Sequence, residues 1–332
     1  MKRVFLAAYL LCCFLMGWSQ QQVIFETDMG NDVDDALALD MLYKYHAEGR
    51  IKLLGVTLNK EGIFPPQFID ITNTWYGQKR IPIGRSSRED GSVVAGNNYT
   101  KTVAEAVDAE GQPLYRRSIK HYDRLPDAVT LHRRLLSKAK DGSVTIVSVG
   151  FSTNLAALLD TKPDRYSKLS GRELVARKVD RLVMMAGNFA QPDHAEYNVV
   201  NDIPACQKVL AEWPTPVYCS GFEVGLDIRF PARCIREDFT WAEHHPMVDA
   251  YCAYLPQLED RPTWDLTAVL FAVDAADRFG ISPAGRIEIT KEGYSRFTAD
   301  PFANRFYLTV NAQQRKQILD YFVDMITKQP NK

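Results

Sequence analysis

Five acidic residues are crowded at the point where the first apolar segment of the chain gives way to a helical pattern. The stretch VIFETDMGNDVDDALALDML, residues 23–42, contains Glu26, Asp28, Asp32, Asp34 and Asp35. Helix capping and the helix dipole would occupy one or two of these carboxylates. Asp28 instead lies directly at the predicted strand end, and no lysine or arginine occurs between Arg3 and Lys44. Because a partly buried carboxylate without a countercharge is costly, this pattern favours a bound cation.

The residue types around this cluster restrict the kind of chemistry. An all-oxygen set of ligands favours Ca²⁺ or Mg²⁺ over zinc. A helix-loop-helix calcium site needs glycine at its sixth position and glutamate at its twelfth, and no frame through residues 28–42 has both. A phosphatase of the Asp-x-Asp type needs a nucleophilic aspartate at the first position of its motif, where this chain has Glu26, so this class is disfavoured. A serine hydrolase is disfavoured because SVGFST lacks the small-x-Ser-x-small elbow, so Ser148 and Ser152 are interpreted as turn residues.

Short β-rich runs alternate with segments of helical spacing, and this alternation predicts the fold. The runs are QVIFET, IKLLGVTL, SVTIVSVG, DRLVMMAG, TPVYCS and RIEIT. Helices are predicted over residues 34–48, 67–76, 126–140, 153–159 and 312–326, with a long loop or flap over 85–117. The runs are nearly continuous in apolar residues, as in strands covered on both faces. We therefore expect an α/β fold with a doubly wound, mostly parallel sheet flanked by helices, forming a single domain over residues 20–332.

Oxygen-bearing side chains follow several of these predicted strands. Asp28 and residues 32–35 follow the first strand, Asn59 the second, residues 152–154 the third and Asn188 the fourth. In an open parallel sheet, ligands bind beyond the carboxyl ends of the strands. We therefore expect these side chains to meet at one rim of the sheet.

The N-terminus and the overall charge limit the location and the partners. Lys2 and Arg3 precede an apolar run over residues 4–18, which predicts a signal peptide over residues 1–19 and export to a periplasm or the extracellular space. No later stretch is long and apolar enough for a membrane span, so no membrane association is expected after processing. The 40 basic and 41 acidic residues leave no excess positive charge for a nucleic-acid polymer. Four cysteines follow the signal peptide, and one disulfide among them is plausible: Cys206, Cys219, Cys234 and Cys252.

Four sequence blocks occur in an order that is typical of one enzyme family. They are VIFETDMGNDVDDALAL, VSVGFSTNLAALL, LVMMAGNF with the following AEYN, and RPTWDLTAVLFAV, and together they span residues 23–273. They resemble the signatures of the inosine-uridine type nucleoside hydrolases. The resemblance implies a Ca²⁺-dependent hydrolase that releases ribose and a free base from a small-molecule nucleoside. It also implies that the chain could form a homo-oligomer, as members often do.

The resemblance carries over particular roles to matching positions. Asp28 would be both a metal ligand and the general base, and Asp34 would hold the ribose 2′-hydroxyl. The implied metal ligands are Asp28, Asp35, the backbone carbonyl of Thr153, and Asp265. Asn59 would lie near the metal and the ribose, and Glu196 and Asn198 would bind sugar hydroxyls. Asn188 and Gln191 are the two alternatives for the contact with the 5′-hydroxyl.

The sequence departs from the family pattern in two places that bear on specificity. GNDVDD has two extra residues before the paired aspartates, which makes Asp32 an alternative to Asp34 for the ribose contact. Trp264 stands where pyrimidine-accepting members carry a proton-donating histidine. Trp264 is either a packing aromatic or, as in purine-preferring members, a stacking partner for the base, with His194 as a further candidate near the leaving group. Purine ribonucleosides are therefore the expected substrates.

Two alternatives to this hypothesis remain open. The chain could be a non-catalytic protein that binds a sugar or nucleoside on the same fold, although binding alone does not require a base such as Asp28. It could also hydrolyse another glycosyl substrate, because the region expected to contact the 5′ end of a nucleoside is unusual.

Overall fold

The computed structural model describes residues 20–86, 99–191, 193–274 and 276–330. The predicted signal peptide, residues 1–19, lies outside the described residues, as does much of the predicted flap, at 87–98. Within the described part of the chain, no helix is both long and apolar enough to cross a membrane.

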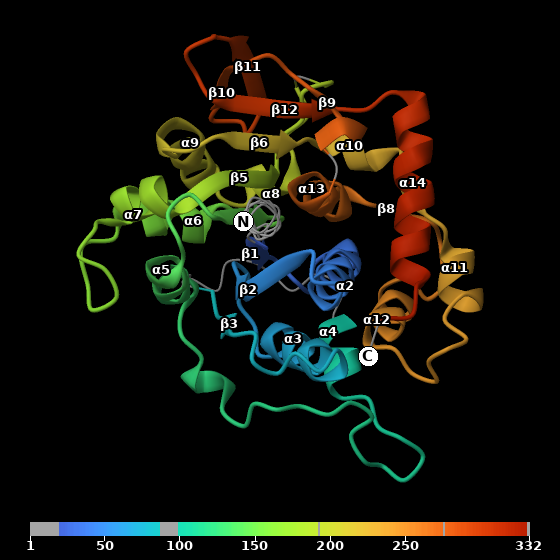
Figure 1. Ribbon diagram of the computed structural model, residues 1–332. Coiled ribbons are helices and arrows are strands. Elements are labelled where there is room, and N and C mark those ends of the chain that lie inside the picture. Colours follow the sequence, from blue (N-terminus) through green and yellow to red (C-terminus); the bar gives the residue numbers. More distant parts are fainter. Residues whose placement is uncertain (1–19, 87–98, 192, 275, 331–332) are drawn as a thin grey trace, which may run out of the picture.

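The centre of the fold is a mostly parallel sheet (Figure 1). Its parallel strands are β1 (Gln21–Thr27), β2 (Ile51–Leu58), β3 (Ile83–Gly84), β4 (Val144–Ser148), β5 (Val179–Met185), β6 (Val217–Ser220) and β12 (Arg305–Thr309). The spatial order β3-β2-β1-β4-β5-β6 reverses direction between β1 and β4. This reversal is the switch point of a doubly wound sheet, where ligands bind beyond the strand ends.

Beyond β12 the sheet becomes antiparallel. This edge contains β9 (Gly280–Ile281), β10 (Gly285–Ile289) and β11 (Ser295–Ala299). The run RIEIT was predicted among the strands of a parallel sheet, and it forms β10 in this antiparallel edge. Its burial alternates along the strand, as expected for an edge with one covered face. A separate pair of short strands, β7 (Arg229–Phe230) and β8 (Arg261–Pro262), is antiparallel.

Helices cover both faces of the sheet (Figure 1). Their bounds are α2 (Asp34–Ala47), α3 (Phe64–Trp75), α4 (Tyr99–Ala104), α5 (Ala128–Lys138), α6 (Thr153–Asp160), α7 (Gly171–Lys178), α8 (Tyr197–Val200), α9 (Ile203–Glu212), α10 (Phe222–Leu226), α11 (Ala232–Glu237), α12 (Pro246–Tyr254), α13 (Trp264–Val273) and α14 (Ala312–Thr327), with 3-10 turns η1 (Tyr122–Arg124) and η2 (Ala276–Arg278). Val23 and Phe25 pack into the core beneath α2, α13 and α14, whereas Ile24 packs with α5, α6, α7 and α9. Successive side chains of β1 therefore pack into two different cores, which explains why Val23, Ile24 and Phe25 are all apolar.

Most predicted helices are present, with shifted ends. The helix predicted from residue 67 begins earlier, at Phe64, because Pro65 and Pro66 fit the first turn of a helix. The segment 85–117, predicted as a loop or flap, contains the short helix α4. The four cysteines that follow the predicted signal peptide are all free thiols, so none of them forms the disulfide considered from the sequence.

His245 is a buried histidine directly before α12. It accepts a hydrogen bond from the Met247 backbone at 3.2 Å, and its exposed fraction is only 2%. Burial lowers the pKa of His245 to about 4, although Asp40, 3.6 Å away, opposes this shift. The aromatic side chains of Trp75, Phe239 and Trp241 surround the imidazole and exclude water.

We expect this buried histidine to make the protein acid-sensitive. Folding favours the neutral imidazole, so its contribution to stability is complete above the unfolded pKa of 6.5 and is lost as the pH falls towards about 4. The loss should reach about 3 kcal/mol in the free energy of unfolding, measured by urea denaturation across this range. His245→Gln should flatten the dependence, and the exposed neighbour variant His244→Gln should keep it. An unchanged pH dependence in His245→Gln would contradict this explanation.

Candidate active site

A pocket of about 350 Å³ lies at the switch point of the sheet. Asp28 directly follows β1, and backbone hydrogen bonds hold the neighbouring strand ends together, from Asn59 to the Thr27 carbonyl at 3.1 Å and from Val149 to the Glu26 carbonyl at 2.8 Å. The residues that line the pocket are Asp28, Asn31, Asp32, Asp34, Asp35, Val149, Met185, Glu196, Tyr197, Asn198, Phe222, Tyr254, Arg261, Trp264 and Asp265. The pocket therefore gathers residues from both halves of the chain.

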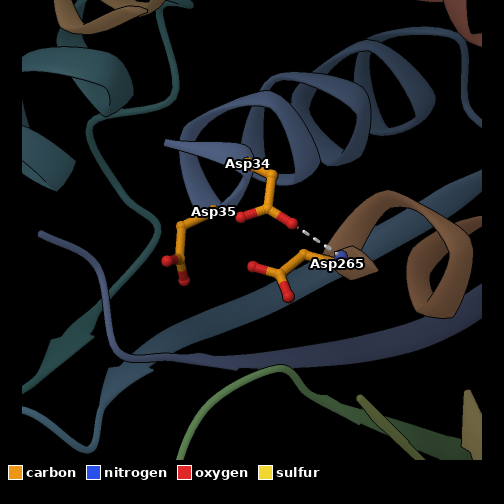
Figure 2. Close-up of side chains that lie close together, drawn as sticks. All are labelled: Asp34, Asp35 and Asp265. Carbon is orange, nitrogen blue, oxygen red and sulfur yellow. Dashed lines mark hydrogen bonds between the residues drawn. The ribbon is translucent and has the colours of Figure 1, made fainter. Parts of the chain in front are cut away.

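Three buried aspartates form a cluster in this pocket (Figure 2). Asp34 and Asp35 occupy the first turn of α2, and Asp265 is the second residue of α13. One carboxylate oxygen from each lies within 4.8 Å of the others, and the Asp265 backbone N–H donates to Asp34 at 3.0 Å. We call Asp34, Asp35 and Asp265 the acidic triad. No side-chain hydrogen bond caps α2, so these aspartates are not explained as helix caps.

Burial raises the pKa values of all three triad carboxyl groups well above their ordinary range, and repulsion among the neighbouring aspartates adds to the shift. Burial also raises the pKa of Asp28 to about 6, although a hydrogen bond from Asn31 and the charge of Lys60 oppose the shift. Such a set is costly when ionised unless a cation accompanies it. The donor set consists of carboxylate oxygens, which suits Ca²⁺ or Mg²⁺.

The strand ends at this rim are packed too closely for larger side chains. A Cβ atom at Gly150, just after β4, would lie 2.5 Å from Asn59 Oδ1 and 2.7 Å from the Asp28 backbone nitrogen. The glycine is therefore required where β1, β2 and β4 converge. Asn59 donates to the Phe151 carbonyl at 2.9 Å, and its buried Oδ1 atom has no hydrogen-bond partner within the described residues.

Most of the site residues predicted from the sequence line this one pocket: Asp28, Asp34, Asp35, Glu196, Asn198, Trp264 and Asp265. Thr153, Asn59 and Asn188 do not line it, although they lie at neighbouring strand ends. The Thr153 side chain donates to Asp202, and Asn188 accepts from the Gln191 backbone at 2.8 Å. The roles assigned to all of these residues remain predictions.

Glu196 and Asn198 also hold the backbone around the pocket. The Glu196 carboxylate accepts hydrogen bonds from three backbone N–H groups, those of Gly187, Asn198 and Val199. The Asn198 amide donates to the carbonyls of Val149 and Met185, at 2.9 and 3.1 Å, and so ties the ends of β4 and β5 together. Burial raises the pKa of Glu196 to about 7. Part of their hydrogen-bonding capacity is therefore used by the protein itself.

Arg261, which no sequence motif indicated, lies in the pocket and pairs with Asp32. Its Nε atom donates to Asp32 Oδ1 at 2.9 Å, and Nη2 donates to the other carboxylate oxygen. The guanidinium carbon lies 5.2 Å from the ring centre of Tyr254 and 5.4 Å from that of Trp264. The two partners are 229 residues apart, so nothing local in the sequence indicated the pair.

Phe222 and Trp264 also line the pocket, and we call these two side chains the aromatic wall. Trp264 is stacked on Phe222 with ring centres 5.4 Å apart, and its indole N–H donates to the Phe222 carbonyl at 2.9 Å. His194 in turn stacks on Phe222 at 4.6 Å but does not line the pocket. Trp264 thus packs within the protein and also lines the pocket. A packing role and a role as stacking partner for a base are therefore compatible.

The doubly wound sheet and its pocket define an α/β protein that holds a small polar molecule beside a cluster of carboxylates suited to a divalent cation. The chain belongs to the inosine-uridine preferring nucleoside hydrolase family, whose sequence model matches residues 23–324. It is accordingly a hydrolase that acts on N-glycosyl compounds, with nucleosides as the substrates of its family.

Solved structures of nucleoside hydrolases share this fold at low sequence identity. A purine-preferring ribonucleoside hydrolase from Gardnerella vaginalis is 18% identical, with a TM-score of 0.70 and coverage of 92% of this chain and 98% of that one. A plant nucleoside hydrolase is 16% identical, with a TM-score of 0.70 and coverage of 94% and 100%. The type III effector XopQ, solved with adenosine diphosphate ribose, is 16% identical, with a TM-score of 0.63 and coverage of 93% of both chains. A search of curated proteins found no match.

Proposed function

We propose that this protein is an exported, Ca²⁺-dependent hydrolase that cleaves the N-glycosidic bond of purine ribonucleosides. The observation that carries the proposal is the convergence of the acidic triad and Asp28 in one pocket that is also lined by the aromatic wall. Family membership supports nucleoside hydrolysis, and the all-oxygen donor set supports Ca²⁺.

The proposed chemistry requires negative charge near the anomeric carbon and a base for the attacking water. Cleavage of a ribosyl C–N bond passes through a transition state with oxocarbenium character, which nearby carboxylates stabilise. When bound by Asp28, Asp35, Asp265 and the Thr153 carbonyl, Ca²⁺ would supply Lewis acidity toward water and a hard partner for vicinal hydroxyls. Asp28 takes the proton from the attacking water, and Asp34 holds the 2′-hydroxyl.

Trp264, in the aromatic wall, would contact the leaving base. Trp264 cannot donate a catalytic proton, but it can stack against a purine, which offers a larger ring surface than a pyrimidine. The arrangement of Trp264 and Phe222 supports a purine preference.

Trp264→Ala should therefore reduce kcat/KM for inosine by about tenfold or more and reduce it less for uridine. Trp264→Phe, which keeps an aromatic face, should retain most of the activity on inosine. Initial rates of reducing-sugar release measure both effects. Equal losses on inosine and uridine would contradict a stacking role.

The function itself is tested by incubating the mature protein with inosine, adenosine, guanosine and uridine, with Ca²⁺ or with a chelator. Ribose release from the purine nucleosides that requires Ca²⁺ is the expected result. Tight nucleoside binding without ribose release would support the non-catalytic binding protein instead. Release of sugar from a different glycosyl compound, with none from the four nucleosides, would support the other alternative.

Export is part of the proposal and rests on the apolar run near the N-terminus. Expression of the full chain in a host with a secretory pathway should yield a mature protein that lacks residues 1–19. N-terminal sequencing of the protein recovered outside the cytoplasm tests this. Recovery of uncleaved protein from the cytoplasm alone would contradict it.

A further inference from the structure

Side chains from several elements hold residues 28–33, the loop that connects β1 to α2. We propose that the Asp32–Arg261 ion pair is a clasp that fixes this loop against β8, directly before α13, and thereby sets how tightly Asp28, Asp35 and Asp265 bind a divalent cation. The inference rests on the proposed function, because it assumes that these three carboxylates bind such a cation.

The positions of Asp32 and Arg261 in the chain support this role. Asp32 lies two residues before Asp34, and Arg261 lies four residues before Asp265. The ion pair therefore joins the same two segments that supply the triad. A direct hydrogen bond between those segments is the 3.0 Å contact of the Asp265 backbone N–H with Asp34. Any change in the spacing of the segments would alter the separation of the triad oxygens.

The geometry of the Asp32–Arg261 ion pair also supports this role. Two guanidinium nitrogens of Arg261 bind the two carboxylate oxygens of Asp32, an arrangement that restrains orientation as well as distance. Nη2 also donates to the Tyr254 hydroxyl at 3.2 Å, and the guanidinium lies over the rings of Tyr254 and Trp264. The side chains of Asp32 and Arg261 are only 24% and 25% exposed. This is a held ion pair rather than a loose surface contact.

The rest of the loop is restrained at its backbone. The Tyr99 hydroxyl accepts from the Gly30 N–H and donates to the Asp32 carbonyl, both at 2.9 Å. Lys60 donates to the Gly30 carbonyl at 3.2 Å and to the Asn31 side chain. These contacts hold the loop to α4 and to the end of β2, whereas the Asp32–Arg261 pair holds it to β8. Loss of the clasp should therefore loosen the triad and leave the fold intact.

A purely electrostatic influence of Arg261 and a clasp predict opposite changes in Ca²⁺ affinity for the substitution Arg261→Gln. Arg261 carries a positive charge that acts on Asp34. If charge were its only influence, Arg261→Gln would remove a repulsive cation and strengthen the binding of Ca²⁺. If the clasp positions the triad, the same substitution weakens the binding of Ca²⁺. The sign of the change in affinity therefore separates the two explanations.

The experiment measures Ca²⁺ affinity by isothermal titration of the metal-free mature protein, without substrate. Arg261→Gln and Asp32→Asn should each weaken binding by about tenfold, and the double variant should bind no more weakly than either single variant. Arg261→Lys keeps the charge but loses the bidentate geometry, and should show an intermediate loss. Arg286→Gln, which breaks the exposed pair with Asp300 far from the pocket, should leave Ca²⁺ affinity unchanged.

The outcomes distinguish failure of the inference from failure of the proposed function. Unchanged or tighter Ca²⁺ binding in Arg261→Gln, or fully additive losses in the double variant, would overturn the clasp alone. Absence of Ca²⁺ and Mg²⁺ binding in the wild-type protein would overturn both the clasp and the proposed metal dependence. Circular dichroism and thermal unfolding of the metal-free variants check the fold. Should Arg261→Gln fail to fold, Arg261→Lys carries the test, and an affinity equal to that of the wild type would overturn the clasp.

Discussion

Asp28→Asn should lower kcat for nucleoside hydrolysis by about three orders of magnitude while the protein remains folded. The substitution preserves the size of the side chain but removes the group that accepts the proton from water. In the metal-free protein, burial raises the pKa of Asp28 to about 6, and a Ca²⁺ ion bound beside it would lower this pKa and keep the carboxylate ionised, as a general base requires. Reducing-sugar release under single-turnover conditions measures the loss directly.

A surface aspartate provides the control for this experiment. Asp141 is exposed and pairs with Arg177 and Lys178, so Asp141→Asn should retain full activity. Binding of a nucleoside to Asp28→Asn without turnover would agree with a role in the chemical step. Retention of most of the activity would show that another group, within the triad or outside it, acts as the base.

Asp265→Asn should weaken Ca²⁺ binding by about a hundredfold or more and, in the metal-free protein, should raise the melting temperature. The two effects have opposite signs because burial and the neighbouring aspartates raise the pKa of Asp265. In the absence of metal, burying this carboxyl group beside the other aspartates destabilises the fold at neutral pH, and the neutral amide removes that cost. In the presence of Ca²⁺, the same charge is part of the binding site. Thermal unfolding with Ca²⁺ and with a chelator measures both effects.

The same electrostatics predict how the effect of Ca²⁺ on stability changes with pH. A carboxyl group whose folded pKa is raised stabilises the protein below its unfolded pKa, and this contribution is lost as the pH rises through the folded value. In the metal-free protein, the contribution of these carboxyl groups to stability should therefore fall as the pH rises above their ordinary pKa of 3.8, and the rise in melting temperature caused by Ca²⁺ should grow. The exposed control Asp160→Asn should leave both quantities unchanged. A lower melting temperature for metal-free Asp265→Asn would contradict the cation site.

Part of the architecture was readable because it depends on local patterns. Continuous apolar runs predicted strands covered on both faces, and β1 does divide its side chains between two cores. The polar residues after those runs predicted a site at the strand ends, since parallel strands point their carboxyl ends to one edge. Asp28 and Asp35, which lie seven residues apart in one sequence block, could be placed in one pocket on this basis.

Other features of the site depend on contacts between distant segments. The sequence suggested Asp32 only as an alternative ribose ligand, whereas the structure pairs it with Arg261. The sequence assigned Asp34 to the sugar and did not indicate that its carboxylate lies beside those of Asp35 and Asp265, with Asp28 lining the same pocket. Likewise, the burial of His245 depends on the packing of Trp75, Phe239 and Trp241 around its ring.

The amino-acid sequence by itself determined the alternation of strands and helices, the family and the rim that carries the carboxylates, because these follow from short-range periodicity and motif order. Only the tertiary structure decided which carboxylates face one another, which one is paired with a guanidinium, and which polar groups are used to hold the backbone. Those outcomes depend on how α2, β8 and α13 pack together. The distances between these side chains depend on the whole fold, so no periodic pattern in the sequence predicts them.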